Sequence, residues 1–332
     1  MPVVVGTRQA PFRVVVPAGT GSYRFVMFGH GLGGSYEDGT FDGELAAAGV
    51  AKVSVQFYGW SSDDVIDTFV GFTRIFQGSS HAVALLMQAL ADGAAIQASV
   101  GAALGEALAA PTLGGKANPA AGRHADTSTP LWVGGSLGGI MGLVAVGASP
   151  EVRHGMLNVP GAAWSHFVPS SVLFSPIRGL LRGPYQGELN ALHAVAMAQL
   201  NFDEIDGASY STALAKKGAV ILIQESMGDP VVPNVGSAMV AVATGADQVG
   251  AVLSPMVGVS LVAEAVGKSG ITQYRIADTD GFAIHGFAAE NTPAGAAARE
   301  QITAFGASVF AGAPKITVPS GCKGGSCDFS KP

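Results

Sequence analysis

Short runs of β-branched and aromatic residues alternate with longer stretches of helical spacing along most of this chain. The runs predict strands at 3–5, 12–16, 24–28, 51–57, 131–133, 155–159, 219–224 and 271–276. Near-continuous apolar runs separated by helices are typical of an α/β protein with a mostly parallel sheet and helices on both faces. The first two runs are too close for a crossover helix, so we expect those two strands to pair antiparallel.

Three helices are predicted between the early strands, at 39–48, 63–75 and 80–90. The last of these has Val83, Leu86, Met87 and Leu90 at helical spacing. The following stretch, 93–129, is rich in alanine and glycine and contains prolines. We therefore expect the later part of it to form a long surface excursion.

The segment 161–217 is longer than a crossover between neighbouring strands needs, and it has a helical run at 188–200. It predicts a helical cap inserted over the carboxyl ends of the strands. The core then comprises 1–160 and 218–312, and 313–332 form a C-terminal tail. The strongly apolar segment 241–267 predicts a buried pair of helices, with an apolar surface that faces a substrate or partner as the alternative.

Charged residues are sparse, with 18 Lys+Arg against 24 Asp+Glu and a net charge of −6. The chain has no basic stripe that would neutralise phosphates, so we expect no nucleic-acid partner. The uncharged stretch 127–150 is interrupted by glycines and predicts a buried strand, a tight turn and a buried helix. No integral membrane span is therefore expected.

The two cysteines, Cys322 and Cys327, lie close together in the tail and predict a small disulfide. Two exposed or metal-chelating thiols are the alternative. A disulfide suits an oxidising compartment. The start of the chain, Met1-Pro2-Val3, lacks the basic region of a signal peptide. We expect a mature secreted or cell-surface domain, with a cytoplasmic location as the alternative.

The strongest chemical signal is the sequence Gly134-Gly-Ser136-Leu-Gly138, which directly follows a predicted strand and precedes an apolar helix. This G-x-S-x-G pattern suits a nucleophilic serine on a sharp turn, because small neighbours let the strand and the helix approach closely. The N-terminus of the helix would also supply backbone N–H groups near the hydroxyl. A glycine-rich packing turn is the alternative interpretation.

A second glycine-rich segment, His30-Gly31-Leu32-Gly33-Gly34, follows the strand at 24–28. Such a loop exposes N–H groups that can stabilise a developing oxyanion by roughly 3 kcal/mol per donor. The N–H groups of Leu32 and Leu137 are the two candidates. The segment also fits a dinucleotide fingerprint, but the next strand lacks the acidic residue that would hold the ribose, so no such cofactor is expected.

A reactive serine needs a base, and the base needs an orienting carboxylate. Asp229 follows the strand at 219–224, and His285 follows the strand at 271–276. Ser136, Asp229 and His285 thus occur in the order typical of this sheet, each after a strand end where open α/β sheets bind ligands. Asp278, Asp280 and Glu225 remain alternative orienting carboxylates.

Three aromatic residues are predicted at the mouth of a substrate pocket: Tyr58, Trp60 and Trp164. They follow strand ends in the same way as the candidate catalytic residues, although packing under the cap would explain them equally well. The remaining histidines show no metal-ligand spacing, and H-E-x-x-H and C-x-x-C motifs are missing from the sequence. We expect neither a metal nor another cofactor.

These motifs, in this order, resemble the α/β-hydrolase superfamily, and more narrowly bacterial lipases and carboxylesterases with a G-G-S-L-G-G elbow. The resemblance implies Ser136 as nucleophile, His285 as general base and acid, Asp229 as its orienting group, and Leu32 and Leu137 as oxyanion donors. It departs from the common pattern where Gly135 replaces a histidine beside the serine.

We therefore expect a serine esterase or lipase that acts on hydrophobic esters, with contact at a lipid interface. The alternatives are a polyester depolymerase, a thioesterase or a peptidase on the same fold, and a non-catalytic binding protein that keeps the fold.

Overall fold

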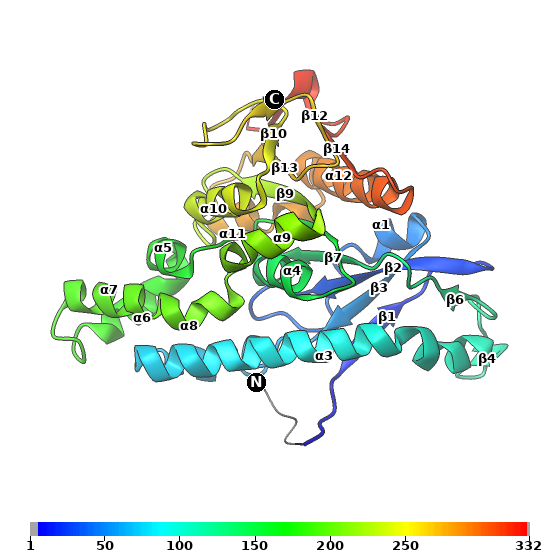
Figure 1. Ribbon diagram of the computed structural model, residues 1–332, viewed down its shortest axis with the longest axis horizontal. Coiled ribbons are helices and arrows are strands. Elements are labelled where there is room, and N and C mark those ends of the chain that lie inside the picture. Colours follow the sequence, from blue (N-terminus) through cyan, green and yellow to red (C-terminus); the bar gives the residue numbers. More distant parts are fainter. Residues whose placement is uncertain (1–5, 331–332) are drawn as a thin grey trace.

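The computed structural model describes residues 6–330, and the predicted strand at 3–5 lies outside this range. A large central sheet crosses the molecule, with helices packed on both of its sides (Figure 1). Its strands occur in the spatial order β1-β3-β2-β7-β8-β9-β13-β10-β11. In chain order these strands are β1 (Phe12–Val15), β2 (Ser22–Gly29), β3 (Val50–Val55), β7 (Leu131–Gly135), β8 (His154–Asn158), β9 (Val220–Ser226), β10 (Asp247–Val249), β11 (Leu261–Val262) and β13 (Gly270–Arg275).

All neighbouring strands of this sheet run parallel except β1, which pairs antiparallel with β3. Among residues 6–330, the antiparallel partner of β1 is β3. Two further short strands extend the sheet, because β6 (His124–Ala125) pairs with β2 and β15 (Cys327–Asp328) pairs with β13. Two small antiparallel pairs lie apart from it: β4 (Thr112–Leu113) with β5 (Lys116–Ala117), and β12 (Glu264–Val266) with β14 (Lys315–Thr317).

The central strands bury side chains on both faces, which explains their near-continuous apolar sequence. In β2, Phe25 and Met27 belong to one buried cluster, while Val26 and Phe28 belong to the other. Successive residues of a strand point to opposite faces, so one short strand contributes side chains to the hydrophobic core on each face of the sheet.

Helices α3 (Ile75–Ala109), α4 (Leu137–Ala148), α9 (Ser211–Lys217) and α10 (Asn234–Thr244) cover one face of the sheet. The opposite face carries α1 (Asp42–Ala47) and α12 (Pro293–Phe310). Helix α1 begins later than the helix predicted at 39–48. The helix predicted at 63–75 corresponds to α2 (Val65–Gly71).

The first part of the stretch 93–129 is helical, because α3 continues as one helix from residue 75 to residue 109, and the expected excursion is confined to the later part (Figure 1). Alanine has the highest helix propensity and dominates this stretch, so the scattered glycines do not end the helix. Gly93 lies where a Cβ atom would meet Val55 of the sheet, which shows that α3 packs closely on β3. Only the part after Pro111 is irregular, with three very short strands.

Among residues 6–330, α3 is also the one helix that is long and apolar enough to cross a membrane, by length and composition. Its side chains Leu86 and Ala89 are fully buried against the rest of the protein. This burial is what a helix packed on a sheet shows.

The segment 161–217 folds into short helices, most of which lie beside one end of α3, whereas α9 packs against α4 (Figure 1). Besides α9 these are α5 (Trp164–Phe167), α6 (Ser175–Leu181), α7 (Glu188–Met197) and α8 (Gln199–Phe202), with 3₁₀ turns at Val168–Ser170, Val172–Phe174, Asp203–Ile205 and Gly207–Tyr210. The predicted helix at 188–200 is thus divided between α7 and α8. We keep the name cap for residues 161–217.

The predicted helix pair at 241–267 is wrong. Helix α10 ends at Thr244, and the rest of the segment contains β10, β11 and β12 joined by irregular loops. Glycines and a proline interrupt it, and valine favours strands over helices. Part of this apolar segment lies at the surface, since Val257 is 95% exposed.

The tail is fastened to the sheet. Cys322 and Cys327 form a disulfide, as predicted, and Cys327 also belongs to β15. An ion pair between Arg275 and Asp328 adds a second link at the same edge. Helix α11 (Gly281–His285) and 3₁₀ turns at Phe287–Ala289 and Lys323–Gly325 complete the described elements.

Candidate active site

Ser136 lies on the turn between β7 and α4, at the carboxyl end of the central strand. Its backbone φ is 56° and its ψ is −124°, a conformation that is costly for a residue with a side chain. The Ser136 N–H donates to the carbonyl oxygen of Asn158 at 2.9 Å, which holds the turn against the neighbouring strand β8. Backbone strain of this kind is typical of a serine raised above the strand ends for nucleophilic attack.

Two glycines of the motif are needed for close packing. A Cβ atom on Gly138 would lie 1.9 Å from the carbonyl oxygen of Gly29, and one on Gly134 would lie 2.4 Å from the backbone of Gly138. Strands β2 and β7 and the start of α4 therefore meet backbone to backbone around Ser136. The spacing of the motif has a steric cause in this fold.

The loop after β2 is held by His30, whose side chain is fully buried. The Phe57 N–H donates to Nε2 of His30 at 3.0 Å, so Nδ1 carries the proton and donates to the Gly31 carbonyl oxygen at 2.7 Å. Burial lowers the pKa of His30, which favours this neutral form. His30 therefore has a structural, hydrogen-bonding role in this loop.

The same contacts orient the next amide. The Gly31 carbonyl oxygen also accepts from the Gly34 N–H at 3.0 Å. In a planar trans peptide the C=O and the following N–H point in opposite directions, so a fixed Gly31 carbonyl fixes the Leu32 N–H. A Cβ atom on Gly31 would lie 3.6 Å from Cβ of Ser136, which places this peptide beside the serine.

Leu32 and Leu137 both line the cavity that Ser136 borders. Within residues 6–330, neither N–H group donates a hydrogen bond. Leu137 is the first residue of α4, where backbone N–H groups have no partner within the helix. Both amides remain candidates for the oxyanion hole on this geometry.

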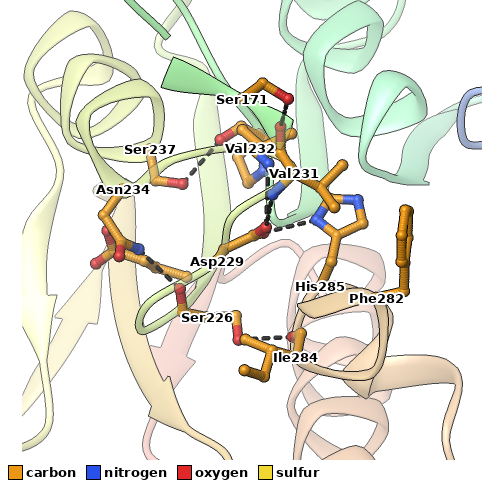
Figure 2. Close-up of polar contacts among 12 residues, drawn as sticks. Ser171, Ser226, Asp229, Val231, Val232, Asn234, Ser237, Phe282, Ile284 and His285 are labelled. Carbon is orange, nitrogen blue, oxygen red and sulfur yellow. Dashed lines mark hydrogen bonds and ion pairs between the residues drawn. The ribbon is translucent and has the colours of Figure 1, made fainter. Parts of the chain in front are cut away.

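His285 and Asp229 are in direct contact. His285 Nδ1 lies 2.6 Å from Asp229 Oδ2, and the side chain of Asp229 is 1% exposed (Figure 2). The other oxygen, Oδ1, accepts from the N–H groups of Val231 and Val232 at 2.8 and 3.0 Å. The carboxylate is therefore fixed by its own turn and directed at one nitrogen of the imidazole.

Ser136 and His285 line a common cavity, but they are not hydrogen-bonded to each other. The Nε2 atom of His285 is buried and has no hydrogen-bond partner within the described part of the chain. In free enzymes such contacts are often long and shorten when substrate binds. The structure brings the three side chains to one edge of the sheet and joins two of them.

The competing carboxylates are engaged elsewhere. Asp280 accepts from the Phe282 N–H and caps α11, and Asp278 accepts from the N–H groups of Thr279 and Asp280. Glu225 accepts from Gln273 and Asn234 side chains, and burial raises its pKa. Asp229 is the only one of the four that contacts His285.

Sequence reasoning missed two residues that position this pair. Ser226 Oγ donates to the carbonyl oxygen of Ile284, the residue before His285, at 2.7 Å (Figure 2). The Asn234 side chain donates to the Ser226 carbonyl oxygen and accepts from the Gly228 N–H, which holds the turn that carries Asp229. No sequence motif marks these contacts: the first joins segments that only the sheet brings together, and the others lie within the turn that follows β9.

A large apolar cavity extends from Ser136 into the cap and encloses about 830 Å³, part of it open to solvent. Ser136 and Ser171 are the only residues with hydroxyl groups among its lining residues, none of which is charged, and its walls include Trp60 and Trp164. Its other lining residues are Leu32, Phe69, Phe72, Ile75, Leu137, Ile140, Phe167, Val168, Leu173, Phe174, Ile177, Leu181, Val195, Ala198, Phe202, Val231 and Val232.

Tyr58 does not line this cavity, which corrects its expected place. Its ring lies under the guanidinium of Arg8, and its hydroxyl donates to the Gln9 carbonyl oxygen. Tyr58 and Trp60 follow the same strand, but the turn directs only Trp60 into the core, where it contacts Trp164 edge-on. Among residues 6–330 no group of three His, Cys, Asp or Glu residues is arranged to hold a metal ion.

No protein-family model matches this chain. No curated protein sequence matches it either. Among solved structures it is similar to an acylaminoacyl peptidase in complex with Z-Gly-Gly-Phe-chloromethyl ketone, with a TM-score of 0.53 and 14% identity, over 91% of this chain and 39% of that one. It is also similar to acetyl xylan esterase 1 from Thermoanaerobacterium sp. JW/SL YS485, with a TM-score of 0.50 and 16% identity, over 82% of this chain and 75% of that one.

At these identities the similarity establishes the fold alone. This chain has the α/β-hydrolase fold, as its motifs predicted. It spans less than two thirds of the acylaminoacyl peptidase chain.

Proposed function

We propose that this protein, which has the α/β-hydrolase fold, is a serine hydrolase that cleaves carboxylic esters through an acyl-enzyme intermediate. One observation carries the proposal. A strained Ser136 lies beside two free backbone amides and an apolar cavity, on the sheet edge that also carries the His285–Asp229 pair. Asp229 is the orienting carboxylate of this proposal.

In the first half-reaction, Ser136 Oγ attacks the ester carbonyl carbon. Because Nδ1 of His285 donates to Asp229, Nε2 keeps a free lone pair and takes the hydroxyl proton. The carbonyl oxygen becomes an oxyanion, which the Leu32 and Leu137 N–H groups stabilise. The C–O bond to the alcohol then breaks, and Nε2 gives its proton to the departing alkoxide.

In the second half-reaction, the acyl group is attached to Ser136 as an ester. Nε2 of His285 removes a proton from water, and the resulting hydroxide attacks the acyl carbon. The second oxyanion collapses, Ser136 Oγ takes the proton back from Nε2, and the carboxylic acid leaves. Every step uses side chains and amides of this chain.

The apolar cavity supports a hydrophobic acyl group, because its walls are mostly hydrocarbon and contain no charged side chain. We therefore place the activity with lipases and carboxylesterases and not with peptidases. Helices α2, α6, α7 and α8 line this cavity and also expose apolar side chains on their outer surfaces: Ile66, Val70, Leu180, Leu189 and Leu200. This supports contact with a lipid surface near the cavity.

A secreted or cell-surface location is part of the same proposal. The Cys322–Cys327 disulfide supports it, because reducing compartments keep most thiols free.

The test is hydrolysis of p-nitrophenyl esters by the purified protein, with Ser136→Ala as the variant. We expect Ser136→Ala to lose nearly all activity and to lose labelling by a fluorophosphonate probe. Ser170→Ala, an exposed serine of the cap outside the cavity, is the matched control and should retain both. Activity that survives in Ser136→Ala would remove this residue from the mechanism, and an unlabelled wild-type protein would favour a non-catalytic binding role.

A panel of esters, thioesters, insoluble polyesters and peptide amides would separate the related activities. We expect soluble esters with apolar acyl chains to give the highest kcat/KM.

A further inference from the structure

Ser136 borders a second cavity, on the side away from the cap. This cavity encloses about 480 Å³, part of it open to solvent, and shares only Ser136 with the apolar cavity. Its lining residues are Phe28, Gly31, Asp38, Thr40, Phe41, Gly135, Ser136, Asn158, Val159, His285, Gly286, Ala288 and Ala289. We call it the His285 cavity, because it contains the imidazole and the apolar cavity does not.

The position of His285 decides which part of an ester enters each cavity. A general acid must lie within hydrogen-bond reach of the oxygen that it protonates, and here that oxygen belongs to the leaving alcohol. The alcohol therefore lies on the His285 side of Ser136. The acyl chain then occupies the apolar cavity, where the N–H groups of Leu32 and Leu137 are available to the oxyanion.

Besides the hydroxyl groups of Ser136 and Thr40 and the imidazole, the polar side chains of the His285 cavity are those of Asp38 and Asn158. Asp38 Oδ1 accepts from the Thr40 N–H, while Oδ2 has no hydrogen-bond partner among residues 6–330. Asn158 donates from its amide nitrogen to Gln224, and its Oδ1 lies 3.7 Å from the place of a Cβ atom on Gly135, beside the elbow. No lysine or arginine lines this cavity.

The buried side chain of Lys52 holds the loop that carries Asp38. Lys52 is 1% exposed, and its Nζ donates to the carbonyl oxygens of Asp38 and Thr40, both at 2.7 Å. It also pairs with Asp42 at 2.6 Å. Asp42 is paired with Arg13 as well, so two cations share this one carboxylate, and the Asp38 carboxylate forms an ion pair with neither of them.

We propose that the His285 cavity binds an alcohol that carries further hydroxyl groups, and that Asp38 selects it by accepting a hydrogen bond from one of them. Carboxylate acceptors form the stronger class of hydrogen bond to hydroxyl groups. An alkyl alcohol of equal size would leave Asp38 without a partner after its water is displaced, which costs binding energy. This inference rests on the proposed esterase function and assigns the alcohol side of its substrate.

The experiment compares esters with the same acyl chain and different alcohols: 1-octanoylglycerol, propyl octanoate and octanoylcholine. Each is assayed with the wild-type protein, with Asp38→Asn, and with Glu37→Gln as the matched control. Glu37 is an exposed carboxylate on the same loop that does not line the cavity. Asparagine keeps the size of Asp38 and an oxygen that can accept the Thr40 N–H, so the loop should remain folded.

We expect the wild-type protein to prefer the glyceryl ester over the propyl ester in kcat/KM. Asp38→Asn should lower that preference about tenfold, mainly through KM, while propyl octanoate hydrolysis stays the same. Glu37→Gln should leave the preference unchanged.

Equal wild-type rates for the glyceryl and propyl esters, or a preference that survives in Asp38→Asn, would overturn the assignment while leaving the esterase function intact. If Asp38→Asn lowers kcat/KM for octanoylcholine only, Asp38 acts by charge attraction alone, and the assignment is overturned as well. A folded wild-type protein that hydrolyses none of the three esters would instead contradict the proposed function itself.

Discussion

Nδ1 of His285 lies 2.6 Å from Oδ2 of Asp229, although the two residues belong to loops that follow different strands. The carboxylate is fixed on its other oxygen by two backbone N–H groups, so it cannot rotate away without losing both. The pair is therefore oriented before any substrate arrives. This is the relationship on which the proposed proton transfers depend.

The first prediction concerns this pair. Asp229→Asn should lower kcat by roughly 10⁴-fold with little change in KM, because the amide would favour the wrong tautomer of His285. Steady-state kinetics on p-nitrophenyl octanoate would measure it. Asp278→Asn, an exposed carboxylate on the loop before His285, is the matched control and should behave like the wild type. A large loss of kcat in Asp278→Asn, with wild-type kcat in Asp229→Asn, would identify Asp278 as the orienting group.

The second prediction concerns the length of the acyl chain. Ala198 is fully buried and lines the apolar cavity, so Ala198→Leu should shorten it. We expect the octanoate-to-butyrate ratio of kcat/KM to fall about tenfold. Ala196→Leu, at an exposed position near the end of α7, two residues before Ala198, should leave the ratio unchanged. An unchanged ratio in both variants would show that the acyl chain does not occupy this cavity.

The third prediction concerns pH. Burial lowers the pKa of His30 and of His154, so the unfolded chain binds protons on these groups more readily than the folded protein does. Their contribution to stability is present at neutral pH and is lost as the pH falls below about 6.5, by at most about 1.4 kcal/mol per pH unit for each. Glu225 has a raised pKa and acts in the opposite sense.

Urea unfolding of the wild type and of each histidine variant would be measured at pH 7.5 and pH 5.5. The contribution of each histidine is the difference between wild type and variant in how the free energy of unfolding changes with pH. We expect the stability of His30→Asn and of His154→Asn to depend less on pH than that of the wild type. His154 lies at the start of β8, away from the proposed site, so its variant tests the argument even where His30→Asn does not fold. If the free energy of unfolding changes equally between the two pH values in all three proteins, the argument is refuted.

The fourth prediction concerns the tail. The disulfide between Cys322 and Cys327 closes a short loop, so replacing both residues by serine should lower the free energy of unfolding by about 2 kcal/mol. Denaturant unfolding would measure the loss, and reduction of the wild-type protein should produce the same shift. A double variant as stable as the oxidised wild type would show that the tail is held by β15 and the Arg275–Asp328 ion pair alone.

The strands and the elbow could be predicted because their sequence constraints are local. A parallel strand buried on both faces must be apolar throughout, and a serine turn pressed against two backbones requires glycine at 134 and 138. The long helix α3 was not predicted in full, because an alanine- and glycine-rich stretch offers little contrast between polar and apolar positions. Its packing against β3 decides the structure there.

The supporting contacts of the site could not be predicted for a different reason. Ser226 meets Ile284 only because β9 and β13 are neighbours in the sheet, and Asn234 meets Glu225 across the turn that follows β9. Tyr58 and Trp60 show the same limit at short range, since a single turn separates a surface ring from a core ring. Such pairings depend on the assembled fold.

Ser136 is the single residue shared by two otherwise separate cavities. Once the alcohol has departed, the acyl group still fills its own compartment, so the incoming nucleophile must arrive through the space that the alcohol vacated. Water and a fresh alcohol therefore compete for one entrance. On the proposed mechanism, concentrated glycerol would therefore divert part of the acyl-enzyme from hydrolysis to transfer of the acyl group to glycerol.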